Sequence, residues 1–166
     1  MANTAAFDSY RFWVVGALSG QSAAGVVQVL PLAAAGIVLG LLTATRLNAL
    51  ALGDDIARAL GVSPALARGL GFAAIALLCG SATAAAGPIG FVGLVVPHAI
   101  RAVIGPDWRW IVPFSLLAGP ILILASDILG RVIAFPSEIE VGIVTAMIGA
   151  PVLLWLVTSL RRERAR

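Results

Sequence analysis

The chain has 166 residues, of which 60% are hydrophobic and only 11% are charged, and its mean hydropathy is +1.04. Soluble domains are about 45–50% apolar and about 25% charged, so this composition indicates a bilayer protein and excludes an ordinary soluble domain. All eleven basic residues are arginines, which excludes a P-loop lysine, a Schiff-base lysine and a Ser–Lys pair.

The other titratable residues argue against catalysis and metal binding. The single cysteine, Cys79, excludes an internal disulfide and a thiolate cluster. One histidine, His98, and eight acidic residues leave little material for a metal site or a catalytic triad. We therefore expect no catalytic residue, no metal site and no bound cofactor. The net charge of +3 would suit nucleic acid, but four arginines fall within residues 161–166, directly after an apolar run. This segment is typical of a membrane-flanking basic tail, so no nucleic-acid partner is expected.

The first elements along the chain are an interfacial patch and a spanning helix. The apolar patch at residues 12–18 is shorter than the roughly 20 residues that a crossing needs, so it predicts a re-entrant or interfacial segment. The sequence around it does not have the pattern of a signal peptide. Residues 26–45 predict the first crossing, with Pro31 near its start, where a missing backbone N–H costs least.

The uncharged stretch at residues 69–100 is too long for one crossing, and its composition predicts a break within it. Proline and glycine interrupt helices, and here they are Gly87, Pro88 and Gly90. With two crossings, nine of the eleven arginines share one side of the membrane, whereas one crossing divides them almost evenly. Arginine-rich connections face the cytoplasm, so we expect two crossings here and a cytoplasmic C-terminus.

Two further spans complete the predicted fold. Residues 111–126, continued past Asp127, form one, and residues 141–160 form the last. The expected fold is all-α: a multispanning transmembrane helix bundle with about five crossings and the short N-terminal segment, forming one transmembrane domain over residues 1–166.

The connection at residues 46–68 predicts a short helix of its own. It has acids in the first turn and a glycine at the stop, as helix ends prefer, and Ile56 and Leu60 share a face. A solvated connector and a docking helix both fit this pattern. The residues that define it are Asp54, Asp55, Ile56, Arg58, Leu60 and Gly61.

Two polar positions inside the apolar spans require an interpretation. Asp127 is an intramembrane acid and therefore a functional candidate, and Arg131 lies four residues later, where the two side chains can form an ion pair. Neutralisation of Asp127 at the headgroup level is one reading of Arg131. His98 has no acidic or cysteine neighbour in the sequence, so we interpret it as a hydrogen-bonded helix residue.

Four stretches stand in one recognisable order and spacing. They are RLNALALGDDIARALGV (46–62), GPIGFVGLVVPHAIR (87–101), LASDILGR (124–131) and EVGIVTAMIGAPVLLWL (140–156). Together they resemble the FecCD type of ABC-importer permease, which carries iron–siderophore complexes, haem or cobalamin. The resemblance covers residues 7–160 and corresponds to the C-terminal half of such a permease.

The resemblance implies a transport subunit in the cell membrane rather than an enzyme. Its implied partners are an ABC ATPase that binds ATP and Mg²⁺, an extracytoplasmic substrate-binding protein, a second permease copy and the N-terminal half. Residues 46–68 would be the cytoplasmic loop that couples to the ATPase. Arg131 would dock an acidic residue of the binding protein, because a guanidinium pairs bidentately with a carboxylate.

The resemblance also implies structural or pathway roles at turns and helix positions. A tight reversal at residues 87–90 and a close approach to the pathway both remain open, and Tyr10, Phe12 and Trp13 would be interfacial residues or part of a gate. The positions concerned are Gly87, Pro88, Gly90, Pro97, Asp127, Gly142, Gly149 and Pro151. Which substrate is carried does not follow from these residues.

Two other functions remain as alternatives. A truncated, non-transporting membrane subunit would only pack with a permease or an ATPase. A small proton-coupled carrier would need paired buried acids or an inverted repeat, and because Asp127 is the one candidate acid, this alternative ranks last.

Overall fold

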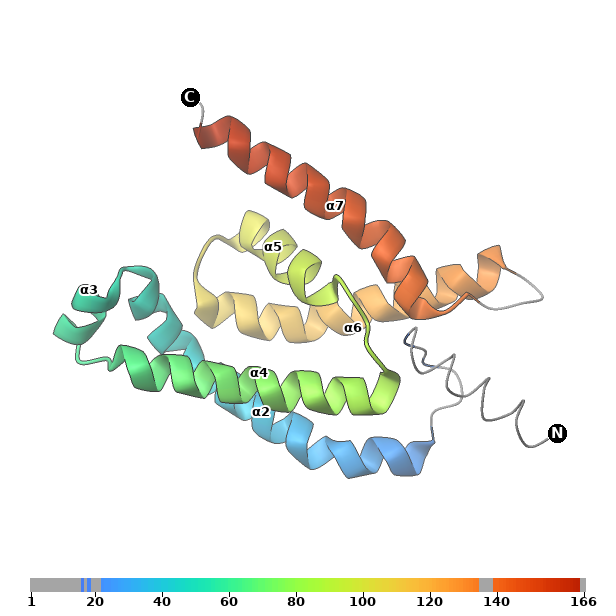
Figure 1. Cartoon of the computed structure of the whole chain (residues 1–166), viewed down its shortest axis with the longest axis horizontal. Coiled ribbons are helices and arrows are strands. Elements are labelled where there is room, and N and C mark those ends of the chain that lie inside the picture. The colour runs from blue at the N-terminus through green and yellow to red at the C-terminus, as the bar shows by residue number, and fades with distance from the viewer. Residues whose placement is uncertain (1–15, 17, 19–21, 135–138, 165–166) are drawn as a thin grey trace. The chain divides into compact units, whose positions relative to one another are not determined.

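The computed structural model describes residues 16, 18, 22–134 and 139–164, without the side chains of residues 153 and 155–164. The predicted N-terminal interfacial segment, apart from Gly16 and Leu18, and the side chains of the basic tail lie outside this range. The described part of the chain is helical and contains no strand (Figure 1). Its helices are α2 (Ala23–Ala51), α3 (Asp54–Ala59), α4 (Pro64–Ala86), α5 (Val92–Ile104), α6 (Trp108–Ile133) and α7 (Val141–Arg164).

Five of these helices are apolar. By length and composition, α2, α4 and α6 can cross a membrane, while α5 and the Val141–Val152 part of α7 are shorter apolar segments. The 13 residues of α5 rise only about 20 Å, less than the roughly 30 Å of a hydrocarbon core. The predicted multispanning helical bundle is confirmed.

The long uncharged stretch breaks where the sequence predicted. α4 ends at Ala86, and Gly87 follows with φ of +75°, a conformation that glycine adopts at little cost. Phe91 has φ of +66° directly before α5, which is uncommon for a residue with a side chain. Five residues, 87–91, therefore separate α4 from α5.

The position of Pro31 differs from the prediction. α2 begins at Ala23, because the Ser22 hydroxyl accepts a hydrogen bond from the Gly25 N–H at 3.1 Å and caps the helix. Pro31 consequently lies inside α2, past its second turn, and its placement near the helix start is wrong. At the other end α2 continues to Ala51, so the connection outside α2 and α4 shortens to residues 52–63.

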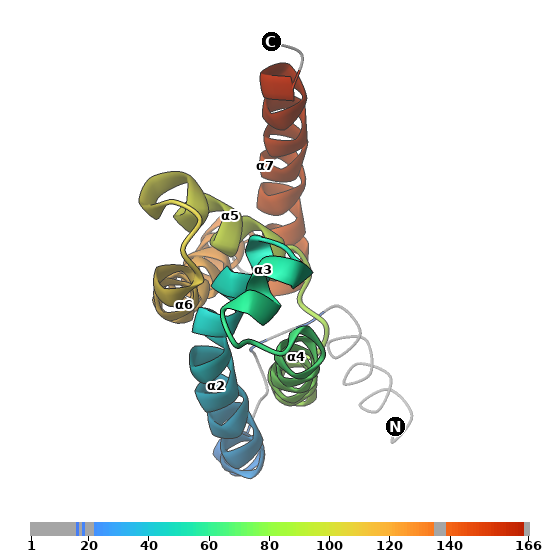
Figure 2. The same cartoon turned by 90° about the vertical axis from the view of Figure 1, so that its left-hand side faces the viewer.

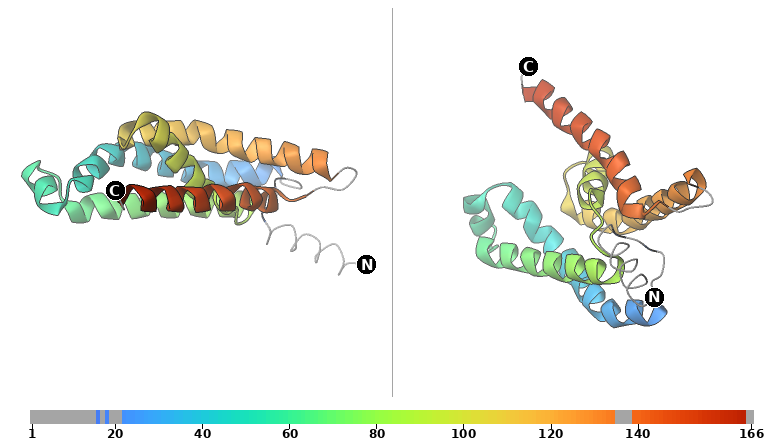
Figure 3. Two further views of the ribbon diagram at one scale, coloured as in Figure 1. Left: turned by 90° about the horizontal axis from the view of Figure 1, so that it is seen from above. Right: turned by 45° about the vertical axis from the view of Figure 1, so that its right-hand side comes forward.

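One compact unit contains Gln21–Ala85 and Ile100–Leu116. In it α2 and α4 run side by side, and α3 joins them at one end (Figures 2 and 3). A Cβ atom on Gly36 of α2 would lie 2.8 Å from Cγ of Leu78 on α4, so the two helices meet at the glycine. Small buried side chains allow helix backbones this close approach in lipid. In this unit they include Ala44, Ala49, Ala57, Ala67 and Ala74.

The other unit contains Ala86–Ala99 and the chain from Leu117 onward, together with Gly16. A Cβ on Gly130 of α6 would lie 2.6 Å from the carbonyl oxygen of Ile139, just before α7, and one on Gly149 of α7 would lie 2.8 Å from Cγ of Phe91. The Gly142 N–H donates to the Gly16 carbonyl at 3.2 Å. Glycines therefore mark the close contacts of this unit too.

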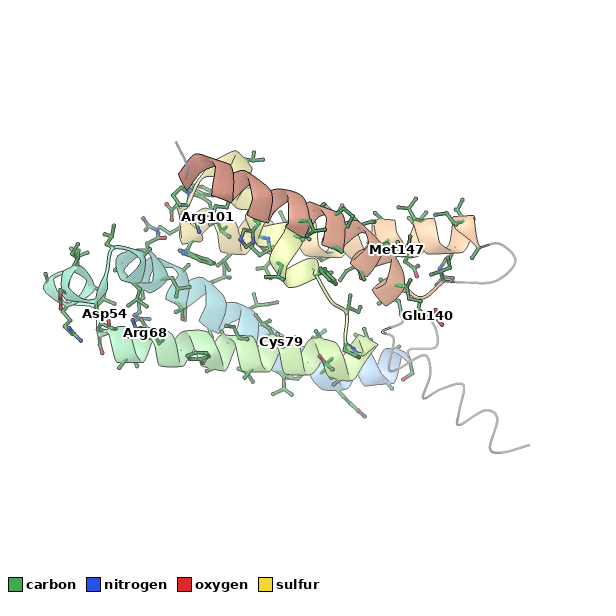
Figure 4. All side chains as sticks on the ribbon, turned by 45° about the horizontal axis from the view of Figure 1, so that its top comes forward. Asp54, Arg68, Cys79, Arg101, Glu140 and Met147 are labelled. Atoms are coloured by element: carbon green, nitrogen blue, oxygen red, sulfur yellow. The ribbon has the colours of Figure 1, made fainter. Side chains whose placement is uncertain are left out.

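Large apolar side chains point away from both units. Phe72, Leu117 and Met147, for example, are 71%, 66% and 70% exposed, and Met147 is labelled on α7 in Figure 4. Outward apolar side chains are what lipid, or another membrane-embedded protein segment, would cover.

Candidate coupling and docking sites

The short helix α3 has well-defined ends. Asp54 and Asp55 lie in its first turn and Arg58 in its last, which matches the partial charges of the helix termini. At its end the Gly61 N–H donates to Arg58 O and the Val62 N–H to Ala57 O, both at 2.9 Å, and Gly61 has φ of +77°. This pair of hydrogen bonds is the Schellman motif. The predicted helix with a glycine stop is therefore confirmed.

The faces of α3 differ in burial. Ala57 is fully buried, whereas Ile56 and Leu60 are 50% and 61% exposed. Asp55 and Arg58 form an exposed ion pair at 3.0 Å beside them. α3 thus attaches to its unit through Ala57 and presents an apolar pair outward, next to charged groups.

An arginine of α4 fixes the start of α3. Arg68 donates from both terminal nitrogens to the two carboxylate oxygens of Asp54, at 2.6 and 3.1 Å, and Figure 4 labels both residues at this end of α4. Two parallel bonds of this kind define orientation as well as distance. From the sequence, Arg68 counts only as one of the nine arginines expected on one side of the membrane.

A polar cluster connects the end of α2 to the start of α6. The Asn48 Nδ2 donates to Asp107 Oδ1 at 2.5 Å, and the Asn48 Oδ1 accepts the Trp108 N–H at 2.9 Å. Asp107 Oδ1 also accepts the Arg109 N–H at 2.9 Å. We call Asn48, Asp107 and Trp108 the α2–α6 junction, and all three lie in the same compact unit.

The same hydrogen bonds lower the pKa of Asp107 below its ordinary value. The Asn48 side chain contributes most, the Arg109 backbone N–H next, and the Arg109 charge adds to them, while partial desolvation opposes them. All three favourable interactions stabilise the carboxylate form. Asp107 is therefore a charged cap of α6 at neutral pH.

Asp127 and Arg131 form the ion pair that their spacing predicted. Arg131 Nε lies 2.8 Å from Asp127 Oδ2, with the side chains 45% and 20% exposed, respectively. The pair is in the last turns of α6, 19 to 23 residues after the helix starts at Trp108. Docking of a partner carboxylate by Arg131 stays a prediction.

The predicted turn and helix positions make local contacts or lie inside helices. The Gly90 carbonyl accepts the Val92 N–H at 2.8 Å, and the Pro88 carbonyl lies where a side chain on Gly16 would be. Pro97 and Pro151 lie inside α5 and α7. The tight reversal at residues 87–90 and the close approach to the pathway both stay predictions, as do the pathway roles of the other positions.

His98 has a local partner. Its Nδ1 lies 2.7 Å from the carbonyl oxygen of Leu94, one turn earlier in α5, as expected for a hydrogen-bonded helix residue. Within the described ranges, no three His, Cys, Asp or Glu side chains lie close enough together to hold a metal ion.

The α2–α6 junction was not predicted from the sequence. Asp107 follows Gly105 and Pro106 and precedes an apolar run, which is a recognisable helix N-cap signal. No local pattern could have shown that its partner is Asn48, 59 residues earlier.

Comparison with known proteins gives one consistent family. The sequence profile of the FecCD transport family matches residues 1–159. The ferric enterobactin transport system permease protein FepD of Escherichia coli (strain K12) is 46% identical over 166 residues, which cover 99% of this chain and 49% of FepD. The hemin transport system permease protein HmuU of Yersinia pestis is 40% identical over 156 residues, covering 94% of this chain and 47% of HmuU.

A solved structure shows the same fold. It is described as an inward-facing conformation of a metal-chelate type ABC transporter, with a TM-score of 0.81 and 31% identity, and the match covers 92% of this chain and 49% of that one. The chain thus spans about half the length of the curated relatives that it matches.

Proposed function

This chain belongs to the FecCD transport family, and on that premise we propose that it forms part of the translocation pathway of an ABC importer. The 46% identity to FepD over 99% of the chain is the observation that carries the proposal. The relatives' names specify ferric enterobactin, hemin and, for a Halobacterium salinarum permease at 40% identity, cobalamin. The proposed substrate class is therefore a bulky iron chelate, haem or cobalamin.

The proposed mechanism involves movement of helices and no chemistry on this chain. A separate ATPase binds and hydrolyses ATP, and its displacement shifts the helices between outward-open and inward-open arrangements. The exposed Ile56 and Leu60 on α3 support this assignment, because an apolar pair flanked by charges suits insertion into a groove of a partner. The Arg68–Asp54 bonds hold α3 in place for that contact.

The proposed orientation places α3 and the C-terminus in the cytoplasm of an inner-membrane protein. Nine arginines then face inward, as membrane topology favours. From Trp108 to Arg131, α6 rises about 34 Å, roughly the thickness of a hydrocarbon core. Arg131 would then lie at the external surface, where it can dock a carboxylate of a substrate-binding protein.

The proposed pathway needs more than the part of the fold present in these 166 residues. The remainder of the permease, in the same polypeptide or in another one, and a second permease copy would complete it. The exposed apolar side chains of α2, α4 and α6 support such contacts within the membrane. The alternative is a non-transporting subunit that packs with a permease or an ATPase, as the half-length match permits.

Reconstitution tests the proposal directly. The chain is combined in proteoliposomes with its ATPase, its binding protein and the rest of the permease, and ATP-dependent uptake of ferric siderophore, haem and cobalamin is measured. We expect uptake of one of them that requires this chain. Retained binding of the ATPase without any uptake would instead establish the non-transporting alternative.

A pair of matched variants tests the coupling surface. Ile56→Asp with Leu60→Asp should abolish both co-purification of the ATPase and uptake, because two charges replace the apolar pair. Ile133→Asp changes the last residue of α6, whose side chain is 72% exposed. This control variant should leave ATPase binding unchanged. Equal ATPase binding by both variants would show that α3 is a solvated connector.

A further inference from the structure

At the α2–α6 junction, both the nitrogen and the oxygen of the Asn48 amide make a hydrogen bond. Asn48 is half-buried, and an amide without partners in such surroundings costs free energy. Its Nδ2 donates to Asp107 and its Oδ1 accepts from Trp108, at 2.5 and 2.9 Å. Both bonds reach residues that follow about sixty positions later, so the side chain joins two separate helices.

On one side, Asn48 is close to the proposed coupling helix. It lies in the last turn of α2, and α3 starts six residues later at Asp54. The turn between them is tight, since the Leu52 N–H donates to Ala49 O at 3.2 Å and the Gly53 N–H to Leu50 O at 3.0 Å. A displacement of α3 therefore pulls directly on the segment that carries Asn48.

On the other side, Asn48 completes the first turn of α6. The first N–H groups of a helix have no partner within the helix. Asn48 supplies the acceptor for the Trp108 N–H, and the Asp107 carboxylate supplies one for the Arg109 N–H. The start of α6 is thus held by α2 rather than by its own cap alone.

Beyond its first turn, α6 continues as one apolar helix. The helix runs without interruption from Trp108 to Ile133 and carries the Asp127–Arg131 pair near its far end. A shift of its first turn acts on an element about 34 Å long up to Arg131.

We propose that Asn48 is a positioning residue through which displacement of α3 by the ATPase reaches α6. The inference rests on the proposed transport function and adds a residue and a route to it. If the junction were only a structural cap, its loss would lower the amount of assembled protein without changing the uptake obtained per ATP hydrolysed.

An exchange of side chains separates these two roles. Asn48→Asp places a second carboxylate against Asp107, so the 2.5 Å contact becomes a repulsion between like charges. Adding Asp107→Asn restores a donor: the amide at position 107 can donate to the carboxylate at position 48, which still accepts the Trp108 N–H. The amide oxygen at position 107 can also still accept the Arg109 N–H.

The experiment measures ATP hydrolysis and substrate uptake by the complete transporter in proteoliposomes, normalised to assembled complex. We expect Asn48→Asp to keep hydrolysis within about twofold while uptake per ATP falls at least about fivefold, the lower end of typical coupling between sites. The double exchange should return uptake per ATP to within about twofold of the unmodified transporter. Gln28→Glu, the same chemical change at an exposed position of α2, should have no effect.

The possible failures are distinguishable. The inference is overturned, and the transport function left intact, if Asn48→Asp does not change uptake per ATP. This includes the case in which uptake and hydrolysis fall by the same factor. An unmodified transporter without uptake overturns the proposed function itself. If Asn48→Asp does not assemble, Asn48→Ala removes both bonds without adding charge, and the same fall in uptake per ATP is required of it.

Discussion

Arg68 of α4 donates hydrogen bonds of 2.6 and 3.1 Å to both carboxylate oxygens of Asp54, the first residue of α3. A six-residue helix such as α3 does not persist alone in water. It depends on this pair of bonds, on the buried Ala57 and on the Schellman motif at Gly61.

Replacement of Arg68 should loosen α3 without unfolding the protein. Arg68→Lys keeps the charge but loses the bidentate geometry. The side chains of the pair are 54% and 38% exposed, and such pairs contribute only about 0–1 kcal/mol to stability. We therefore expect a nearly unchanged unfolding temperature but faster amide hydrogen exchange throughout α3. Arg58→Lys, in an exposed pair within α3, is the control, and equal exchange in both variants would contradict the prediction.

Gly36 should tolerate no side chain, in contrast to Gly40 one turn later on α2. A Cβ on Gly36 would lie 2.8 Å from Cγ of Leu78, whereas a Cβ on Gly40 would have nothing within 4 Å. Gly36→Ala should destabilise the α2–α4 contact by about 1–3 kcal/mol, as overpacking does. Gly40→Ala should be neutral or slightly stabilising because alanine favours helix. Thermal unfolding in detergent micelles measures both, and equal unfolding temperatures would refute the close approach.

Gly149 should be similarly sensitive because of Phe91. A Cβ there would overlap the side chain of Phe91, whose backbone already has a positive φ of +66°. Gly149→Ala should lower the unfolding temperature, and Phe91→Gly in the same chain should restore part of the loss, since glycine adopts that φ freely. Gly119→Ala is the matched control, since a Cβ there would have nothing within 4 Å. Purely additive effects of the Gly149 and Phe91 changes would show that the two residues do not touch.

Acid should weaken the α2–α6 junction. The pKa of Asp107 is lowered on folding, below the reference value of 3.8, so its contribution to stability is complete above that value and is lost as the pH falls through the lower folded pKa. The difference in unfolding temperature between the unmodified chain and Asp107→Asn should be constant from neutral pH to about pH 5 and should shrink below pH 3.8. A difference that stays constant down to pH 2 would show that Asp107 is not stabilised as a carboxylate.

Charge reversal should separate the two interpretations of Arg131. Arg131→Glu places two like charges four residues apart and should weaken docking of the binding protein at least about tenfold, if a guanidinium at position 131 meets its carboxylate. Asp127→Arg combined with Arg131→Glu rebuilds the ion pair with reversed polarity. Binding restored by this exchange would mean that only the pair is needed, whereas docking by Arg131 itself requires binding to stay weak. Surface plasmon resonance on the complete transporter measures the affinity.

Some features of this protein were determined by the sequence alone because their causes are local. The break after Ala86 follows from Gly87, α3 follows from two acids and Gly61 about two turns apart, and the Asp127–Arg131 pair follows from a spacing of four. Each depends on residues within two or three turns of one another. Pro31 was misplaced because the cap at Ser22, a few residues before the apolar run, starts α2 earlier than hydropathy indicated.

The tertiary structure alone decided which helix faces meet. Eighteen glycines look alike in the sequence, yet Gly36 and Gly149 contact a neighbour where Gly40 and Gly119 do not. Asn48 and Asp107 are 59 residues apart, and Arg68 and Asp54 are 14 apart. Such pairs form only when packing brings two helices to one another in a particular rotation and depth, which the hydropathy of each helix does not specify.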